Sequence, residues 1–231
     1  MKSTAHAFKA NVGKALKDER LQESLTRLKS GFKDRRQAAV DQMPEFEALR
    51  DQARDIKNHV LANLDFYLEA YERKVVETGG TVHWAPDARA ARDIVLDICR
   101  RAGARSVTKS KSMIAEEIAL NDHLEAAGIE PVETDLGEYI IQLRKEPPSH
   151  IIAPAVHLTK DQVAETFAEH HRKYGFERVL TERNDLVQEA RQVLRARFLA
   201  ADVGITGANF LIAETGSSVL VTNEGNADLT N

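Results

Sequence analysis

Short apolar runs that alternate with helical patterns are the feature that most limits how this chain can fold. Runs with the length and β-branched content of strands lie at residues 81–84, 105–108, 129–134 and 151–153. Helical patterns lie between and after them, at residues 87–102, 112–127, 138–143, 159–173 and 181–200. Alternating strands and helices with short connections favour parallel strands. The expected fold class is therefore α/β, a mostly parallel sheet with helices on both faces.

The N-terminal part has a different pattern. Residues 1–43 carry widely spaced apolar side chains at helical spacing, which predicts an amphipathic helical arm with a thin apolar face. A partner subunit, a second copy of the chain or the rest of the domain could cover that face. A long helical pattern follows over residues 44–78 and stops at Gly79 and Gly80. The expected organisation is a helical extension at 1–43 and one domain at 44–231.

Composition excludes several classes of protein. The chain has 231 residues with 36 acidic and 32 basic side chains, a formal net charge of -4, so we expect no nucleic-acid partner. Cys99 is its one cysteine, which excludes an internal disulfide or a cysteine-ligated metal site. Cys99 lies beside the apolar stripe of a predicted helix, so it is interpreted as a structural residue. No signal peptide or apolar run of about 18 residues is present, which indicates no membrane span and a cytoplasmic location.

The C-terminal residues 201–231 predict a hairpin of two buried strands, 210–213 and 219–221. Glu214 is the one charged residue in the connecting turn, which also holds Thr215, Gly216 and Ser217. Small residues there, with Thr206, Gly207 and Asn223 in the flanking loops, would let backbone N–H groups approach a ligand. The pattern predicts a pocket for an anionic ligand, although ordinary turn chemistry explains the same residues equally well.

Loops that follow parallel strands gather at one edge of the sheet, where ligands bind. Lys109 and Lys111 flank Ser110 after one predicted strand and could hold a carboxylate or phosphate. The alternative is that a serine only caps the next helix and the lysines are solvated. Glu133, Asp135 and Glu138 follow another strand, and crowding should raise the pKa of one of these carboxyls. Alternatively Asp135 caps a turn and the glutamates face solvent; no metal site is expected.

The histidines leave their roles open, and the common nucleotide-binding motifs are absent. His150 and His157 bracket the run 151–153, and either could donate a proton or bind a carboxylate. His170 and His171 are interpreted as surface residues of a helix. No glycine-rich dinucleotide loop, Walker lysine loop or serine-hydrolase elbow is present, so these activities are not expected.

Several strings in one order resemble the lactate-utilisation protein B family, whose members contain a LUD domain. They are GGTVHWA at 79–85, KSKSM at 109–113, ETDLGEYIIQL at 133–143, PSH at 148–150 and GITGANFLIAETGSSVLVTNEGN at 204–226. The resemblance implies the NagB/RpiA/CoA transferase-like fold, in which substrates lie over strand-end loops. CoA transferases use a glutamate nucleophile in a turn similar to that of Glu214, but the local string differs. Family members also carry cysteine-rich [4Fe-4S] regions, which this sequence lacks.

The resemblance implies an iron–sulfur subunit of a system that oxidises L-lactate to pyruvate, with companion LutA- and LutC-like subunits. We expect no cofactor within these residues, a fragment of a longer protein because Asn231 follows closely on the last strand, and a possible homo-oligomer. Lactate or a similar small carboxylate is the expected ligand. The substrate or anion is expected at Lys109, Ser110, Lys111, Thr206, Gly207, Thr215, Gly216, Ser217 and Asn223. Proton transfer is expected from Glu214, Asp135 or His150.

Two alternatives belong to other classes. A non-catalytic assembly or anion-binding module would dock partners through residues 1–43. A sugar-phosphate isomerase-like enzyme would turn over without a redox partner.

Overall fold

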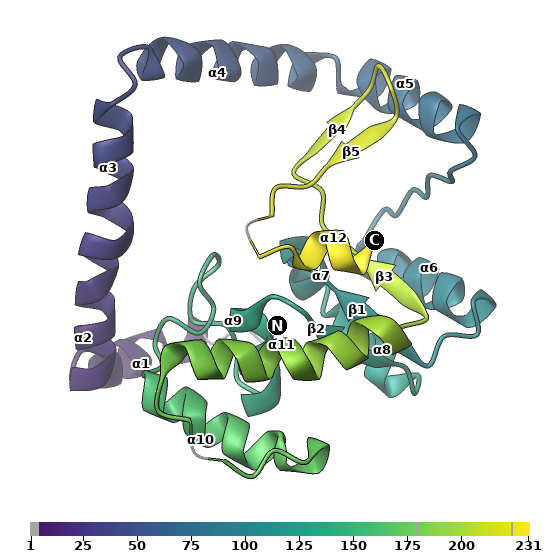
Figure 1. Cartoon of the computed structure of the whole chain (residues 1–231). Coiled ribbons are helices and arrows are strands. Elements are labelled where there is room, and N and C mark those ends of the chain that lie inside the picture. The colour runs from purple at the N-terminus through teal and green to yellow at the C-terminus, as the bar shows by residue number, and fades with distance from the viewer. Residues whose placement is uncertain (1–4, 179, 223) are drawn as a thin grey trace. The chain divides into compact units, whose positions relative to one another are not determined.

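The computed structural model describes residues 5–178, 180–222 and 224–231. The chain divides into two compact units, and Figure 1 shows their elements. The first unit consists of Met1–Ser24, Trp84–Gly207 and Leu220–Asn231, and the second of Leu25–His83 and Ala208–Val219. Among the described residues, no helix combines the length and apolar character needed to cross a membrane.

Helices make up most of both units. The first unit contains η1 (Ala5–Ala7), α1 (Phe8–Ala15), α6 (Ala88–Arg101), α7 (Met113–Glu117), α8 (Leu120–Ala126), α9 (Leu136–Arg144), α10 (Lys160–His170), η3 (Arg172–Tyr174), α11 (Arg183–Ala200) and α12 (Asn226–Thr230). The second contains the π-helix η2 (Lys29–Lys33), α3 (Asp34–Asp41), α4 (Phe46–Ala62) and α5 (Leu64–Glu77). Helix α2 (Glu19–Leu28) spans the boundary between the units. The N-terminal extension is therefore helical, as predicted.

The first unit is built on a parallel sheet of three strands. They are β1 (Ser106–Lys109), β2 (Glu130–Glu133) and β3 (Val203–Ile205), in the order β2-β1-β3. Val107 pairs with Pro131, and Thr108 pairs with Val132. Because side chains alternate along a strand, Val107 and Val132 point to opposite faces of this sheet.

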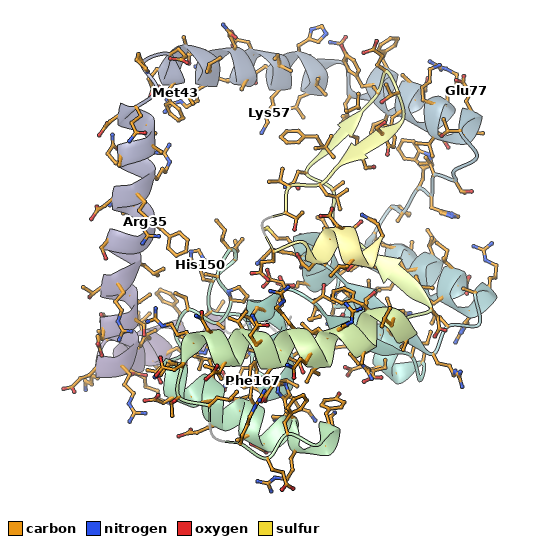
Figure 2. All side chains as sticks on the ribbon, viewed as in Figure 1. Arg35, Met43, Lys57, Glu77, His150 and Phe167 are labelled. Atoms are coloured by element: carbon orange, nitrogen blue, oxygen red, sulfur yellow. The ribbon has the colours of Figure 1, made fainter. Side chains whose placement is uncertain are left out.

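Each face carries its own apolar core. Val107 belongs to a cluster with side chains of α6, α7 and α8, and this cluster includes the fully buried Cys99. Val132 belongs to a second cluster with side chains of α9, α10 and α11, centred on the fully buried Phe167 (Figure 2). Helices thus cover both faces of a parallel sheet, and the predicted α/β class is confirmed.

Helix ends follow the local sequence. The Asp87 carboxylate accepts the N–H of Ala90 at 2.8 Å and caps α6, and Thr159 with Gln162 forms a capping box at α10. Gly79, at φ +89°, follows the end of α5, as the sequence predicts. These short-range signals are reliable because the partners lie within one helical turn.

Two predicted strands are absent. Residues 81–84 form no ladder within the described part of the chain, and residues 151–153 form a bend with Ile151 and Ile152 exposed. In the bend, Nδ1 of His150 accepts the N–H groups of Ile152 and Ala153 at 3.1 and 3.2 Å. These two local hydrogen bonds replace the ladder bonds that a strand would need.

The predicted helix 112–127 is two helices. Ala119 lies in the left-handed region at φ 54° and ψ 48°, which separates α7 from α8. The Arg92 guanidinium donates to the Ile118 carbonyl at 2.7 Å and satisfies one acceptor that the break leaves free. An alanine in this conformation is unusual, so the sequence contains no signal for the break.

The predicted hairpin is confirmed in the second unit, with changes. Strand β4 (Phe210–Ile212) pairs antiparallel with β5 (Ser217–Val219), which begins two residues before the predicted second strand. The strands are not buried, because Phe210 is 57% and Leu211 50% exposed. Gly216, at φ +72°, lies against the α5 backbone, where an added Cβ would be 2.7 Å from the Val75 nitrogen. The Tyr71 and Ser218 hydroxyls are 2.8 Å apart.

Strand β3 and helix α12 were not predicted, and Gly204 explains how they pack. An added Cβ on Gly204 would overlap the Thr230 carbonyl oxygen of α12. Gly204→Ala is therefore expected to lower the free energy of unfolding by about 2–3 kcal/mol through overpacking against backbone. Denaturant titration measures this, with Gly13→Ala as the control, since Gly13 lies in α1 with nothing within 4 Å of its added Cβ. Equal stability of the two variants would contradict the packing argument.

Candidate functional site

The loops after the three parallel strands meet at one edge of the sheet. The Ser110 N–H donates to the Ile205 carbonyl at 2.9 Å, and the Thr134 N–H donates to the Lys109 carbonyl at 2.9 Å. An added Cβ on Gly207 would lie 2.8 Å from the Lys111 carbonyl oxygen. The expected convergence of these loops is therefore present in the first unit.

Several other predicted site residues lie in the second unit or outside the described residues, whereas Thr206 lies in the first unit. Glu214, Thr215, Gly216 and Ser217 form the hairpin turn of the second unit, and Asn223 lies outside the described residues. In this turn, the Thr215 hydroxyl donates to Ser217 Oγ at 2.9 Å. In the first unit, the Thr206 hydroxyl donates to the Asn231 side-chain oxygen at 3.4 Å.

Lys109 and Glu133 form a buried ion pair at this edge. They are register partners on β1 and β2, so their side chains leave the sheet on the same face, and Lys109 Nζ lies 2.5 Å from Glu133 Oε1. Asn121 of α8 closes the triangle, accepting from Lys109 at 2.8 Å and donating to Glu133 Oε1 at 2.6 Å. Lys109 is 1% exposed and Ser110 2%, so an incoming ligand would have to displace neighbours to reach either side chain.

The free edge of β2 is capped by a side chain. The Gln142 amide of α9 accepts the Glu133 N–H at 3.1 Å and donates to the Pro131 carbonyl at 2.8 Å. These bonds replace those that a further strand would make. Gln142 thus holds the Glu133 backbone, while Lys109 and Asn121 hold its side chain.

Lys111 and Asp135 join the next two loops. Lys111 Nζ donates to Asp135 at 3.3 Å and to the Ile152 carbonyl at 3.0 Å, and its side chain is 31% exposed. Asp135 also caps α9, accepting the N–H groups of Gly137 and Glu138 at 3.0 and 3.2 Å. The capping alternative is thereby confirmed for Asp135.

Glu138 is the carboxyl of this cluster whose pKa is raised. Burial is the main cause that raises its pKa to about 9, and the negative charges of Glu133, Glu116 and Asp135 add to the effect. Lys111, 3.8 Å from Glu138 Oε1, opposes the shift. Glu138 therefore carries a proton at neutral pH and is an O–H donor. The pKa of one carboxyl in this cluster is raised, as expected, but burial is a larger cause than the crowding that the sequence suggested, and the solvent-facing alternative is wrong for Glu138.

A cavity of about 670 Å³ opens beside these carboxyls. Its wall comes from α7, α8, α9 and the loop after α9, and it includes both Glu133 and Glu138. Glu133 Oε2 is buried and has no hydrogen-bond partner in the described part of the chain. Because this oxygen is buried, a ligand in the cavity would have to displace neighbouring groups to reach it.

His150 and His157 occupy the loop beside this wall (Figure 2 labels His150). Because Nδ1 of His150 accepts two backbone N–H groups, its ring proton lies on Nε2, which can donate. The His157 ring contacts Ser149 Oγ at 2.8 Å and Glu146 at 3.2 Å, which makes His157 part of the loop's internal bonding.

His171 is a core residue, so its interpretation as a surface residue was wrong. Its ring has no exposed surface, and it lies 2.9 Å from the Tyr139 hydroxyl and 2.8 Å from Glu189. Burial lowers the pKa of this imidazole against the opposing pull of Glu189. Glu189 also accepts from Arg178 at 3.1 Å. The network joins α9, α10 and α11, and helical periodicity gave no sign of it.

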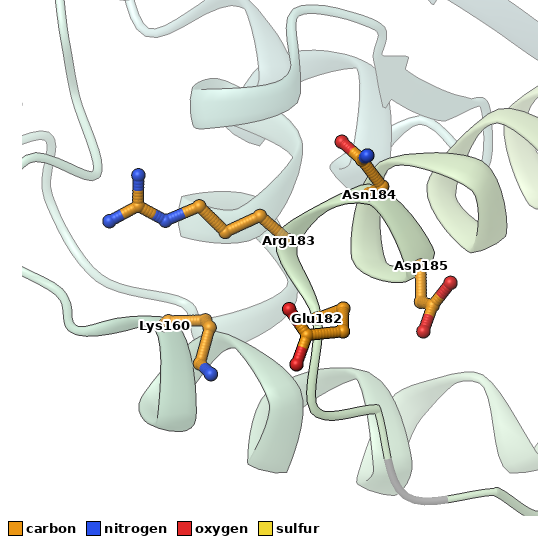
Figure 3. Close-up of a pocket in the computed structure, with 5 residues that line it drawn as sticks. All are labelled: Lys160, Glu182, Arg183, Asn184 and Asp185. Carbon is orange, nitrogen blue, oxygen red and sulfur yellow. The ribbon is translucent and has the colours of Figure 1, made fainter.

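A second cavity of about 540 Å³ lies where α10 and α11 begin (Figure 3). Charged side chains of both signs line it, namely Lys160, Glu182, Arg183 and Asp185, together with Asn184. None of the residues predicted for the site contributes to it.

The chain's own residues do not fit an iron–sulfur cluster. Such a cluster needs several thiolates, whereas Cys99 is the one cysteine of the sequence. Its side chain is fully buried, and burial raises the pKa of the thiol. Within the described ranges there is also no group of three or more His, Cys, Asp or Glu side chains arranged for a metal ion.

Comparison with known proteins identifies the family. The model of the LUD domain matches residues 68–231. Lactate utilization protein B of Bacillus velezensis is 45% identical over 231 residues, which is 99% of this chain and 48% of that protein. Lactate utilization protein B of Bacillus subtilis is 42% identical over 99% of this chain and 47% of its own length. A protein of Escherichia coli named uncharacterized electron transport protein YkgF is 41% identical over 98% and 47%.

The chain thus spans about half the length of these curated relatives. No solved structure matches it. Because the family model covers most of the chain, including every strand of both sheets, the chain belongs to the LUD domain family.

Proposed function

We propose that this chain is the LUD part of a protein that acts in the oxidation of L-lactate to pyruvate. The observation that carries the proposal is the identity of 42–45% to proteins named lactate utilization protein B, sustained over 99% of the chain. The matched region spans the strand-end loops as well as the core, so a shared role is a better explanation than a shared scaffold alone.

In this proposal the sheet edge holds the substrate carboxylate. Lys111 is the cation for this task because its side chain is partly exposed, whereas Lys109 is enclosed by Glu133 and Asn121. Thr206 and Gly207 lie on the neighbouring loop and complete the anion site. A lactate carboxylate would compete with Asp135 for the Lys111 ammonium group.

Oxidation of lactate removes two electrons and two protons from the C–H and O–H groups at C2. Asp135 beside Lys111 could accept a proton, and His150 could exchange one through Nε2. Glu214 stays a prediction for the second unit. The electrons require an acceptor, and the single buried cysteine cannot ligate one. We therefore place the [4Fe-4S] clusters and the LutA- and LutC-like partners of the proposal outside these 231 residues.

Deletion of the gene, in the organism that encodes the chain, tests the role. The deletion strain is expected to lose growth on L-lactate but not on glucose, and the full reading frame should restore it. Normal growth of the deletion strain on L-lactate would contradict the proposal.

Lys111→Gln in the full protein tests the site. Lactate affinity is expected to fall about tenfold or more because a charge-assisted contact is lost. Lys57→Gln is the matched control, since Lys57 is an exposed lysine of α4 in the second unit (Figure 2). Isothermal titration calorimetry measures both, and equal affinities in the two variants would exclude Lys111 from the anion site.

The second candidate is a non-catalytic assembly module. It is favoured by the exposed apolar side chains of β4, where Phe210 and Leu211 are at least half exposed. A Phe210→Ser and Leu211→Ser variant that still oxidises lactate but no longer copurifies with partner subunits would support it.

A further inference from the structure

We propose that Glu224 is an internal competitor of the substrate: its carboxylate occupies part of the anion site at the sheet edge, and the substrate carboxylate displaces it on binding. The inference rests on the proposed function, because it concerns the same site at Lys111. Three observations support it, namely the bond that Glu224 makes, the charge balance around Lys111, and the way in which each carboxylate of the site is held.

Glu224 binds the first backbone N–H group of α9. The helix begins at Leu136, and the Leu136 N–H donates to Glu224 Oε2 at 3.2 Å. The next two N–H groups, those of Gly137 and Glu138, donate to Asp135 Oδ1. Unpaired N–H groups at the start of a helix attract anions. Glu224 therefore takes the one of these three donors that Asp135 leaves free, and its carboxylate lies where an anionic ligand could bind.

This donor lies beside the proposed anion site. Leu136 directly follows Asp135, whose carboxylate accepts from Lys111 at 3.3 Å. Glu224 responds to both charged groups: burial of its carboxyl and the negative charge of Asp135 raise its pKa, whereas the Leu136 N–H and Lys111 oppose the shift. Glu224, Asp135 and Lys111 therefore belong to one charge cluster, and all three lie in the first unit.

The charge balance favours an exchange of carboxylates. Lys111 contributes one positive charge, Asp135 and Glu224 contribute two negative charges, and Glu138 is protonated at neutral pH. A substrate carboxylate added to this cluster would be a third negative charge against one positive charge, which repulsion disfavours. If the substrate replaces Glu224, the net charge of the site stays the same.

Glu224 is the carboxylate that can leave. Asp135 accepts two backbone N–H groups and the Lys111 ammonium group, so its removal would uncap α9. Glu224 is an exposed residue, and within the described ranges its side chain makes only the one hydrogen bond to α9. The neighbouring backbone is held independently, since Asn226 and Ala227 at the start of α12 are buried (Figure 1 labels α12). The Glu224 side chain can therefore rotate into water while α12 stays folded.

Calorimetry with L-lactate on the full protein tests the inference. Glu224→Ala removes the competing carboxylate, so this variant is expected to bind L-lactate about tenfold more tightly than the wild type, because every molecule is then competent to bind. Asp228→Ala is the matched control, since Asp228 is an exposed acidic residue of α12 and its removal takes away the same charge. The affinity of this control for L-lactate should equal that of the wild type.

Glu224→Asp separates the contact from the charge. Aspartate keeps the negative charge, but its side chain is one methylene group shorter and does not reach Leu136 from the same backbone position. Tighter binding of L-lactate is therefore expected in this variant as well. In the wild type, saturating L-lactate should speed up hydrogen exchange in the peptide that contains Glu224, because the contact with α9 is released.

The inference is overturned if Glu224→Ala binds L-lactate no more tightly than Asp228→Ala, or if L-lactate leaves hydrogen exchange in that peptide unchanged. A loss of affinity in Lys111→Gln would then still support the anion site of the proposed function. Conversely, tighter binding by Glu224→Ala together with unchanged affinity in Lys111→Gln would keep Glu224 as the competitor and exclude Lys111 from the anion site.

Discussion

Lys109→Met is expected to lower the free energy of unfolding by about 3–5 kcal/mol, the range found when one partner of a buried ion pair is removed. The Lys109 ammonium group is 2.5 Å from Glu133, and both side chains are at most 5% exposed. Methionine fills a similar volume, so the loss arises from the charge that remains. Without Lys109, Glu133 would keep only the Asn121 amide, at 2.6 Å, near the other carboxyls of the cavity.

The double variant Lys109→Met with Glu133→Gln separates charge from packing. It removes both charges and keeps an oxygen that can accept from Asn121, so it should be more stable than Lys109→Met alone. Such neutral replacements of buried pairs are often harmless. Urea titration at pH 7 measures all three proteins. A loss below about 1 kcal/mol for Lys109→Met would mean that water reaches Glu133 and that the pair is not enclosed.

Much of the sheet edge could be predicted because parallel strands impose it. Once residues 105–108 and 129–134 are identified as strands joined by a helix, the loops at Lys109 and Asp135 must lie at the same edge. The carboxyl cluster is local in sequence as well, so its crowding was visible before the fold was known. The sequence did not indicate which of the three acids would be buried.

Residues brought to the site from other elements could not be predicted. Asn121 reaches the Lys109–Glu133 pair only because the helical region breaks at Ala119, and no propensity favours a left-handed alanine. Glu224 accepts the Leu136 N–H at 3.2 Å across 88 residues, which no local pattern could indicate. His171 lies at the end of α10, where helical spacing does not determine which face is covered.

Burial was misjudged where apolar runs were taken as core. Strand β4 and residues 151–153 are apolar in sequence, yet Phe210, Ile151 and Ile152 are exposed. An apolar run shows what a segment could bury, whereas the partner that covers it depends on the rest of the fold. In residues 150–153, the backbone N–H groups of Ile152 and Ala153 donate to the His150 ring instead.

The pH dependence of stability should carry a large contribution from Glu138. Its pKa is about 9 in the folded protein against an ordinary value of 4.5. Between these values the native state holds a proton that the unfolded state has released, so the contribution is complete below pH 4.5 and is lost as pH rises toward 9. The expected loss is about 1.4 kcal/mol per pH unit. Glu138→Gln removes this dependence, because glutamine does not titrate.

Denaturant titrations from pH 6.5 to 8.5 isolate this effect from that of His171. Burial lowers the pKa of His171 in the folded protein, so protonation of the unfolded form destabilises the protein mainly below about pH 6.5, and it does so equally in both proteins. Across the chosen window, the difference in unfolding free energy between wild type and Glu138→Gln should change by about 3 kcal/mol in favour of the variant. Glu125→Gln, an exposed residue of α8 at the same cavity, should follow the wild type. A constant difference across the window would mean that Glu138 is ionised in the native protein.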